Sequence, residues 1–389
     1  MGGLYHRIFY LCGILFSMHT FLSKLSLVNF KSYSDAVLEF SPRINCFVGD
    51  NGVGKTNVMD AIYYLSMCKS YFAGSDIHHI KHGNEFFVVQ GEYHKSDQTD
   101  SVYCGVKNGS KKIFKRNSKE YDRLSDHIGY LPIVVVSPSD SILITEGSEE
   151  RRKFIDSVIS QYNREYLDNI MRYNRALMQR NMLLKDFDQK NWFDQDMVDM
   201  WDDQLFKLGT AIFEQRKAFI SDLIPVFQRY YEFVSGGNEQ VELVYESQLE
   251  AASLDVLLKE SMQKDRAVLF TTQGIHKDDL ALRLGDYSIK RIGSQGQQKT
   301  FLVALKLAQF EFIKKCSGLH PILLLDDIFD KFDSHRVDKI INLVADEDFG
   351  QIFITDTSSE RMHEILKKIN TDYKLFGIDR NEINVEIRS

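Results

Sequence analysis

The sequence predicts an α/β fold that a mainly helical region interrupts. Two short apolar runs that suit buried parallel strands lie far apart in the chain, at residues 44–48 and 322–325. A glycine-rich turn follows the first run and leads into a helix-like segment at residues 57–67. Between the two runs, residues 148–233 carry apolar residues at helical spacing, with no proline before Pro225. We therefore expect one α/β domain with a helical insertion.

The composition is that of a globular protein with a large core. The chain has 389 residues, of which 43% are hydrophobic and 26% charged, so a disordered or fibrous protein is excluded. Lys and Arg total 48 against 55 Asp and Glu, a formal balance of 48 − 55 = −7, which excludes a simply basic nucleic-acid binder. At about 150 residues per domain, the length suggests two or three domains.

The cysteines and the N-terminus bear on the compartment. Five widely spaced cysteines without a C-x-x-C pair argue against a disulfide framework and a zinc site, and they favour a reducing cytoplasm. Arg7 precedes an apolar run at residues 8–16, which is too short to span a membrane but has the length of a signal-peptide core. No small-residue cleavage site follows, so we interpret residues 1–17 as an N-terminal extension, or as the result of a start codon assigned upstream of Met18. We expect a cytoplasmic protein without a membrane contact.

The elements before the insertion follow from their periodicity. Alternating apolar residues predict a strand at residues 22–30, and two further elements lead to the apolar strand at 44–48. Apolar residues of the helix at 57–67 share one face. Residues 85–136 are typical of β-structure and end in the apolar run 133–136.

The elements after the insertion return to alternating strands and helices. Strand-like stretches recur near residues 241–245, 266–272, 280–286 and 287–292. A helix at 297–316, the buried strand at 322–325, a second helix, a strand at 351–355 and a final helix complete the chain. The predicted divisions are the extension 1–17, a head in two parts, 18–147 and 266–389, and the inserted helical arm 148–265.

The strongest motif is the glycine-rich turn, which satisfies G-x-x-x-x-G-K-[ST] between a strand and a helix. Backbone N–H groups of such a P-loop, with the helix N-terminus behind them, hold the phosphates of a nucleotide. Lys55 would reach the β- and γ-phosphates of ATP, and the Thr56 hydroxyl would bind Mg²⁺. A fortuitous glycine-rich turn is the minor alternative. The predicted nucleotide-binding residues are Gly49, Asp50, Asn51, Gly52, Val53, Gly54, Lys55, Thr56 and Asn57.

A second motif places two carboxylates after a buried strand. The strand at 322–325 presents Asp326 and Asp327 at its C-terminal edge, where open α/β sheets bind ligands. Asp326 would hold Mg²⁺, directly or through water, and Asp327 would polarise the attacking water. We therefore predict Lys55, Asp326 and Asp327 as the catalytic residues. An ordinary strand followed by a turn is the alternative, which the P-loop makes the minor one.

A third motif opens the helix that precedes Asp326. The run Ser-Gln-Gly-Gln-Gln offers a hydroxyl, backbone N–H groups and a helix dipole to an anion. Because the chain already has a phosphate loop, this second element makes sense if it completes the site of a partner subunit. Two heads that enclose two nucleotides in this way are the arrangement of ABC-type ATPases, so the prediction is an ABC-type P-loop ATPase head with an inserted mainly helical arm subdomain. The nucleotide-binding residues predicted here are Ser294, Gly296, Gln297, Gln298 and the later Asp333.

Spacing distinguishes the subclasses of such ATPases. From Thr56 to Ser294 is 294 − 56 = 238 residues, more than a transporter subunit has, and Thr355-Asp356-Thr357 follows the last strand in place of a switch histidine. A transporter ATPase is therefore excluded. An ABC-type head with an inserted helical arm resembles the SMC and RecF group.

From about Leu22 to the C-terminus, the chain resembles the RecF family of that group. The segments that carry the resemblance occur in both head and arm: "KLSLVNFKSY", "NVMDAIYYLS", "VVVSPSD", Arg151-Arg152 with Phe154-Ile-Asp156, "YNRALMQRNMLLK", "WDDQLFKLG", "GIHKDDL", "SQGQQKT" and "LLLDDIFDKFD". The chain departs from the family's pattern at Lys31, Glu149, Ile275, Lys277, and around Asp330 and Phe332.

The resemblance implies an ATP-dependent DNA-binding protein of recombinational repair and replication restart. It implies ATP and Mg²⁺ as cofactors, an ATP-dependent homodimer on gapped or junction DNA, and RecR, RecO and RecA as partners. Asp327 stands where ABC proteins generally have Glu, and its shorter reach predicts a weak DNA-dependent ATPase that acts as a switch. An ABC-linked nuclease is the alternative, but no stretch of adequate length is left for its metal-binding domain.

Positive charge gathers on a predicted β-hairpin. Basic residues beside Phe114 suit contacts with DNA phosphates and with a base face, although a solvated hairpin is an equally good interpretation. The candidates are Lys111, Lys112, Lys115 and Arg116.

Two further clusters allow more than one interpretation. Arg172, Arg175 and Arg180 on the arm suit DNA contacts and core-edge salt bridges equally well. The three histidines between residues 78 and 82 fit a surface loop better than a metal site, because no acidic or cysteine ligand is placed nearby.

Overall fold

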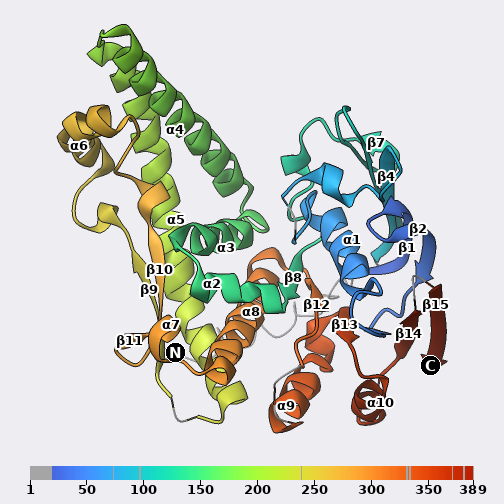
Figure 1. Ribbon diagram of the computed structural model, residues 1–389. Coiled ribbons are helices and arrows are strands. Elements are labelled where there is room, and N and C mark those ends of the chain that lie inside the picture. The colour runs from blue at the N-terminus through green and yellow to red at the C-terminus, as the bar shows by residue number, and fades with distance from the viewer. Residues whose placement is uncertain are drawn as a thin grey trace, which may run out of the picture.

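The computed structural model shows an α/β head on one side and a helical arm on the other (Figure 1). It describes residues 20–72, 74–95, 98–237, 239–329, 332, 334–369, 371–379 and 382–388. The predicted N-terminal extension at residues 1–17 lies outside these ranges. Within them, no helix is long and apolar enough to cross a membrane.

A six-stranded sheet forms the centre of the head, in the order β15-β14-β3-β13-β12-β8. Its strands are β3 (Ile44–Val48), β8 (Ile133–Val136), β12 (Ile322–Leu325), β13 (Ile352–Asp356), β14 (Tyr373–Asp379) and β15 (Glu382–Arg388). All neighbours are parallel except β14 and β15, which are antiparallel. The residues of β3, β8, β12 and β13 are buried throughout, which explains why the predicted strands there are so apolar.

A second, antiparallel sheet lies beside the first, in the order β2-β1-β4-β5-β6-β7. Its strands are β1 (Thr20–Phe30), β2 (Tyr33–Glu39), β4 (Phe86–Lys95), β5 (Gln98–Lys107), β6 (Ile113–Arg116) and β7 (Lys119–Glu120). Helix α1 (Lys55–Met67) contacts strands of both sheets. It is buried on almost every side, because it fills the space between them.

The central sheet divides the core of the protein in two. Ile44 and Cys46 belong to one hydrophobic cluster, which continues into the arm helices, whereas Phe47 faces the other cluster with α1 and the antiparallel sheet. On β12, Leu323 and Leu324 divide in the same way. Successive side chains of a strand point to opposite faces, so both faces of this sheet are covered.

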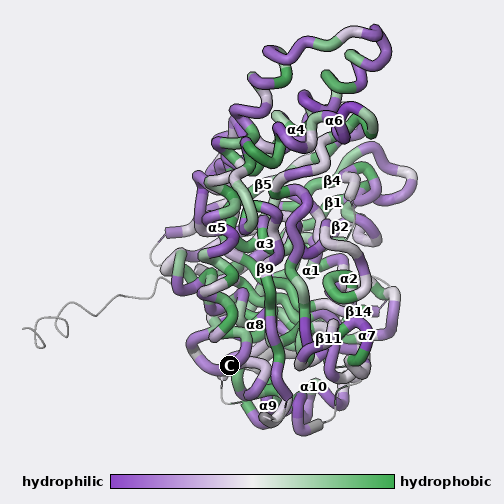
Figure 2. Tube along the Cα trace, turned by 90° about the vertical axis from the view of Figure 1, so that its left-hand side faces the viewer, coloured by the Kyte–Doolittle hydropathy of each residue, from purple (hydrophilic) through white to green (hydrophobic). Residues whose placement is uncertain are grey.

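The arm consists of long helices and a small sheet. Its helices are α3 (Ser148–Ser160), α4 (Arg164–Lys190), α5 (Gln195–Ser235) and α6 (Leu254–Val268). α4 and α5 form a hairpin that projects from the head, with α6 beside its end (Figures 1 and 2). Strands β9 (Val241–Glu246), β10 (Asp279–Leu284) and β11 (Tyr287–Ser288) form the sheet. β9 pairs with β10 across the predicted boundary at residue 265, so the arm and the second part of the head share this sheet.

The remaining helices complete the head. Helix α8 (Gln295–Ser317) packs against α5 and β8, and therefore connects the head to the base of the arm. The other helices are α2 (Ile142–Thr145), α7 (Ile289–Ile292), α9 (Ser334–Val344) and α10 (Ser359–Lys367). Short 3₁₀ helices are η1 (Asp76–His79), η2 (Leu124–Asp126), η3 (Pro138–Ser141), η4 (Gln248–Glu250), η5 (Ile275–Lys277) and η6 (Glu347–Phe349).

The structure corrects three expectations about secondary structure. Residues 266–272 do not form a strand, because α6 continues to Val268 and ends at Leu269 in the left-handed region, at φ 61°. Val268 and Phe270 are exposed, so their alternation marks no buried face. Residues 287–292 form the two-residue strand β11 and then helix α7. The helix after β13 is not the last element, because β14 and β15 follow it.

Candidate nucleotide-binding site

The P-loop lies between β3 and α1, as predicted. Gly49, Gly52 and Gly54 have φ values of 152°, 83° and 113°, a region that side chains rarely adopt. A Cβ on Gly49 would lie 2.3 Å from the carbonyl oxygen of Ile378, and one on Gly54 would lie 2.9 Å from the hydroxyl of Tyr33. The loop therefore needs glycine for its conformation at all three positions, and at Gly49 and Gly54 also for lack of space.

Lys55 and Thr56 begin α1 and point into the site. The buried Lys55 ammonium donates to the carbonyl oxygens of Gly49 and Asp50, at 2.7 and 3.0 Å. The Thr56 hydroxyl lies 3.1 Å from Oδ1 of Asp326. The P-loop and the acidic edge of β12 are thus in direct contact.

Asp326 is a buried carboxylate in a polar setting. It is 4% exposed and accepts a 2.8 Å hydrogen bond from the Thr355 hydroxyl in addition to the Thr56 contact. Burial raises its pKa, and the charge of Asp327 adds to the shift. A carboxylate whose charge is unfavourable here gains from a cation, and a carboxylate beside a hydroxyl is the hard oxygen donor set that Mg²⁺ prefers. Thr56 and Asp326 therefore fit the metal.

Asp327 turns away from the strand. Its φ of 46° lies in the left-handed region, and its backbone N–H donates to the Thr355 hydroxyl oxygen at 2.9 Å. Together with Gln295 and Gln298 of α8 it lines a cavity of about 240 Å³. The second predicted acid and the start of α8, which we call the signature helix, therefore open onto the same space within one chain.

Ser294 caps helix α8. Its hydroxyl oxygen accepts from the N–H of Gln297 at 3.3 Å, and the Gln297 side chain accepts from the N–H of Ser294 at 2.7 Å. The Gln298 amide donates to the carbonyl oxygens of Ile289 and Gly293. Both glutamine side chains are thus engaged within the chain, whereas Ser294 is exposed. This capping box explains why the helix begins here.

Of the other residues predicted for the partner's nucleotide, the structure describes Gly296 but not Asp333. A Cβ on Gly296 would lie 3.4 Å from a guanidinium nitrogen of Arg336, which is close to an ordinary van der Waals contact. Asp333, and the altered position Asp330, lie outside the described residues.

Two groups that support the site were not predicted from the sequence. Thr355, at the end of β13, bridges Asp326 and Asp327. The sequence could have indicated this role, because Thr355 ends the predicted strand at 351–355, and the ends of parallel strands meet at one edge of a sheet. The turn between β1 and β2 supports the P-loop, because Lys31 pairs with Asp60 of α1 at 2.5 Å and Ser32 accepts from the Asn57 amide at 2.8 Å. The departure at Lys31 therefore keeps a positive charge in a buried pair.

The side chains of the basic hairpin are less available to DNA than the sequence suggested. Phe114 is 1% exposed and packs in the core, so it offers no face to a base. Lys112 pairs with Asp76 at 2.7 Å, and Arg116 pairs with Asp100 at 3.1 Å. These two cations already neutralise carboxylates of the fold. Because the strand alternates, the aromatic residue that looked interleaved with them points inward.

Lys111 and Lys115 fit the predicted phosphate contacts better. Lys111 is exposed, and the ammonium of Lys115 lies 5.9 Å from the ring centre of Tyr103. Contact with DNA stays a prediction for all four basic residues.

On the arm, the three arginines have different environments. Arg180 is fully buried and pairs with Asp202 at 2.5 Å and with Asp265 at 2.7 Å, so it is a structural residue. Arg172 and Arg175 are exposed.

The histidines near residue 80 do not all lie on the surface. His79 is 1% exposed and packs against the rings of Phe30 and Tyr64. Burial lowers the pKa of His79, which favours the neutral ring. In the described part of the chain, no group of three or more His, Cys, Asp and Glu side chains is placed to hold a metal ion.

Comparison with known proteins places this geometry in a family. The AAA ATPase domain family matches residues 21–224. The chain is 52% identical over 357 residues to the DNA replication and repair protein RecF of Flavobacterium johnsoniae, which covers 92% of this chain and 99% of that protein. RecF of Phocaeicola vulgatus is also 52% identical, over 365 residues, with 93% and 97% covered.

Solved structures agree with these relatives. The structure of the recombination mediator protein RecF with ATP, from the RecFOR pathway, matches with a TM-score of 0.85 at 27% identity, covering 95% of this chain and 98% of that one. An Smc head domain from Pyrococcus furiosus matches with a TM-score of 0.57 at 17% identity, which shows the ABC-type fold alone. The chain belongs to the RecF family of DNA replication and repair proteins.

Proposed function

We propose that this protein is an ATP-dependent DNA clamp that acts in recombinational repair and replication restart. The contact between Thr56 and Asp326 carries the proposal, because it joins the P-loop to a buried carboxylate at a position that suits Mg²⁺. The resemblance to RecF solved with ATP supports the same nucleotide for this chain.

Different residues of the site bind the phosphates, hold the metal and orient the attacking water. The loop N–H groups bind phosphate oxygens, and Lys55 exchanges its two carbonyl partners for phosphate. Mg²⁺ held by Thr56 and Asp326 would neutralise charge on the phosphates. Asp327 orients the attacking water, and its short side chain makes hydrolysis slow. A weak DNA-dependent ATPase of this kind is a switch that times release.

Two copies of the chain complete each other's sites. The exposed Ser294 of one head, at the N-terminus of α8, acts on the nucleotide of the partner, as a helix N-terminus suits an anion. ATP therefore drives dimerisation, and hydrolysis releases the dimer. The 240 Å³ cavity, which Asp327 lines together with Gln295 and Gln298, supports a coupling between the signature helix and the catalytic acid.

DNA and protein partners follow from the family. The DNA is gapped duplex or a junction between single and double strands, and RecR and RecO act with this protein to help RecA assemble. The RecFOR pathway is the setting given for the solved relatives, and it supports this role.

The test measures dimerisation and retention on gapped DNA, with and without ATP. Lys55→Met removes the phosphate ligand, and Ser294→Arg blocks the trans contact while leaving ATP binding in place. We expect both variants to lose ATP-dependent dimerisation and DNA retention. Ser221→Arg, at an exposed serine of α5, is the matched control and should behave as the unmodified protein. Normal dimerisation of both site variants on ATP would rule out the sandwich.

A further inference from the structure

A further carboxylate, Asp356, lies at the same edge of the central sheet as the two predicted acids, and the proposed chemistry does not use it. Asp356 ends β13 and pairs in register with Val48, the last residue of β3 before the P-loop. On the other side of β13, Ile354 pairs with Leu325, so the residues two positions further on, Asp356 and Asp327, follow neighbouring points of this edge. Asp356 is 2% exposed. It therefore lies between the start of the P-loop and the second predicted acid.

Arg361 holds this carboxylate from the first turn of α10. Its Nε donates to one carboxylate oxygen of Asp356 at 2.9 Å, and its Nη2 donates to the other at 2.6 Å. The N–H of Ser358 donates to Asp356 at 2.7 Å, and the Ser358 hydroxyl oxygen accepts from the N–H of Arg361 at 3.1 Å. A pair with two parallel hydrogen bonds fixes the plane of the guanidinium. Asp356 is therefore a positioning residue for Arg361.

The packing of α10 brings this guanidinium close to the P-loop. The helix contacts β3, the strand that leads into the loop. The side chain of Arg361 is 36% exposed and that of Asp356 only 2%, so the cation is the member of the pair nearer to solvent. Because the pair uses Nε and Nη2, the third nitrogen, Nη1, points away from Asp356. Arg361 thus brings positive charge to the sheet edge at which the phosphates bind.

ATP and ADP differ at this edge only in the γ-phosphate. The N–H groups of a P-loop cradle the α- and β-phosphates, which both nucleotides share. Asp356 stands after β13 where the sequence has no switch histidine, and its charge adds to that of the two predicted acids. Such a group of carboxylates repels a further phosphate. A cation that cancels the charge of Asp356 and faces the γ-phosphate therefore favours ATP over ADP.

We propose that Arg361, positioned by Asp356, binds the γ-phosphate and makes this site prefer ATP to ADP. The inference rests on the proposed ATP site and adds to it the residue that determines which nucleotide is bound. The guanidinium keeps its bonds to Asp356 and donates to a γ-phosphate oxygen. The pair of Asp356 and Arg361 thus takes the place of a switch histidine.

Nucleotide binding measured by calorimetry, without hydrolysis, provides the test. The full chain is titrated with the ATP analogue AMP-PNP and with ADP, each together with Mg²⁺. Arg361→Met should weaken AMP-PNP binding by about tenfold or more, as the loss of a hydrogen bond between charged groups does, and ADP binding by less than about twofold. Arg361→Lys keeps the charge but not the two-bond geometry, and it should recover part of the loss.

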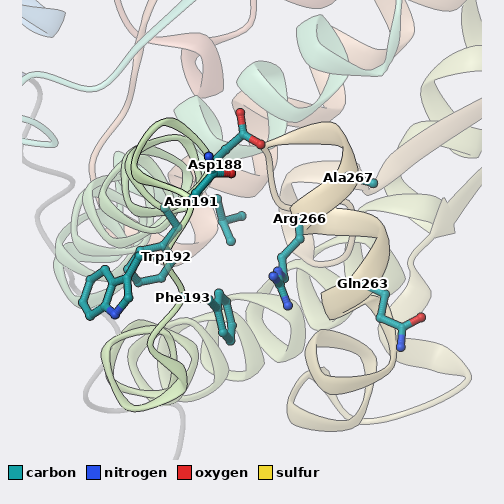
Figure 3. A pocket seen from close by; sticks show the side chains of 9 residues that line it. Asp188, Asn191, Trp192, Phe193, Gln263, Arg266 and Ala267 are labelled. Carbon is teal, nitrogen blue, oxygen red and sulfur yellow. The ribbon is translucent and has the colours of Figure 1, made fainter.

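Two further variants exclude other causes. Arg361→Met leaves the Asp356 charge uncompensated, and that charge alone would repel a phosphate. The double variant Arg361→Met with Asp356→Asn removes it, and we expect this variant to bind AMP-PNP as weakly as Arg361→Met does. Arg266→Met removes an exposed arginine of α6 that lines a cavity of about 620 Å³ at the end of the arm (Figure 3), and it should bind both nucleotides normally.

The outcomes separate this inference from the proposed ATP site. The role of Arg361 is disproved if Arg361→Met weakens both nucleotides equally or neither, if the double variant regains the preference for AMP-PNP, or if Arg266→Met loses it. In each of these cases the unmodified protein still binds nucleotide, and the ATP site stands. Failure of the unmodified protein to bind either nucleotide would overturn both.

Discussion

Asp326 is the residue at which stability and function oppose each other. The carboxyl is buried, and burial raises its pKa above the ordinary value, with the neighbouring Asp327 adding to the shift. A raised pKa means that the folded state prefers the protonated form. The resulting stabilisation is fully present below the unfolded pKa and is lost as the pH rises through the folded pKa.

Asp326→Asn is therefore expected to raise the Tm at about pH 8, where the carboxyl of the unmodified protein is charged. The increase in Tm should be smaller at about pH 4, where that carboxyl takes up a proton. The same change removes a metal ligand and should lower Mg²⁺-dependent ATPase activity by at least about 100-fold. Thermal unfolding at the two pH values and a phosphate-release assay measure these effects. Asp203→Asn, in an exposed pair with Lys207, is the control and should change neither. A lower Tm for Asp326→Asn at high pH would contradict this account.

Thr355 joins the two acids through one hydroxyl. Thr355→Val keeps the shape but leaves the Asp327 N–H without its acceptor and removes one of the two hydroxyl donors to Asp326, so we expect a loss of about 1–3 kcal/mol in the free energy of unfolding. ATP hydrolysis should fall more than ATP binding does, because Asp327 is then misplaced. Urea unfolding and nucleotide titration measure the two effects. Thr355→Ser retains the hydroxyl and should recover most of both; equal losses in the two variants would show that the hydroxyl is not the cause.

At the scale of elements, a buried cluster joins α4, α5 and α6. Arg180→Met leaves Asp265 charged and unpaired in the interior, so we expect a loss of about 3–5 kcal/mol in the free energy of unfolding. Urea unfolding of the arm measures it. The exposed Arg172→Met should change stability by less than about 0.5 kcal/mol. Recovery in the double variant Arg180→Met with Asp265→Leu would support the unpaired charge as the cause, and no recovery would contradict it.

A second buried contact links the P-loop helix to the signature helix. Asp60 of α1 accepts from the Tyr71 N–H at 2.8 Å, the Tyr71 hydroxyl donates to Asp140, and Asp140 pairs with Lys306 of α8 at 2.8 Å. Lys306 is only 4% exposed. Because these charges are buried, they hold α8 in one position relative to α1.

Lys306→Met is expected to separate nucleotide binding from dimerisation. ATP affinity should change by less than about threefold, since Lys306 lies outside the P-loop, whereas ATP-dependent dimerisation should weaken by about tenfold or more, an ordinary coupling of 1–3 kcal/mol. Nucleotide titration and analytical ultracentrifugation measure the two effects. Lys314→Met, on the same helix in a surface pair with Asp348, is the matched control. Equal losses of binding and dimerisation in Lys306→Met would contradict the coupling.

For the whole molecule, the location of charge matters more than its total. Residues 185–203, at the end of α4 and the start of α5, hold −5 of the net charge of −7, so the rest of the chain carries −7 − (−5) = −2. A nearly balanced head is compatible with binding DNA through local basic surfaces. The acidic total therefore describes the arm more than the head.

Affinity for gapped DNA should depend on both nucleotide and salt. With ATP we expect tight binding whose logarithm falls with the logarithm of salt concentration, with a slope of roughly −0.9 for each duplex phosphate neutralised. With ADP we expect weak binding and a shallow slope. Fluorescence anisotropy across a salt series checks both. Lys111→Ala should reduce the slope by about one, and Asp188→Lys should leave it unchanged. Equal binding with ATP and ADP would contradict the clamp.

The sequence alone determined the elements that form the candidate site. Strands at 44–48 and 322–325, the P-loop and the helix that Ser294 begins are confirmed where they were predicted, because their signals are local: burial on both sheet faces, glycine conformations and helix capping. The resemblance to the RecF family rested on the same local motifs.

Only the tertiary structure decided which charged side chains are buried and which partners they have. Arg180 became a core residue because Asp265, 85 positions further on, lies beside it, and Lys112 found Asp76 in the same way. Phe114 turned inward with the pleat of β6, and Thr355 joined two acids from the neighbouring strand. Periodicity tells which faces of a helix or strand are apolar. A charged side chain, however, is buried only where a segment distant in the sequence supplies its partner. The fold decides which distant segments come together.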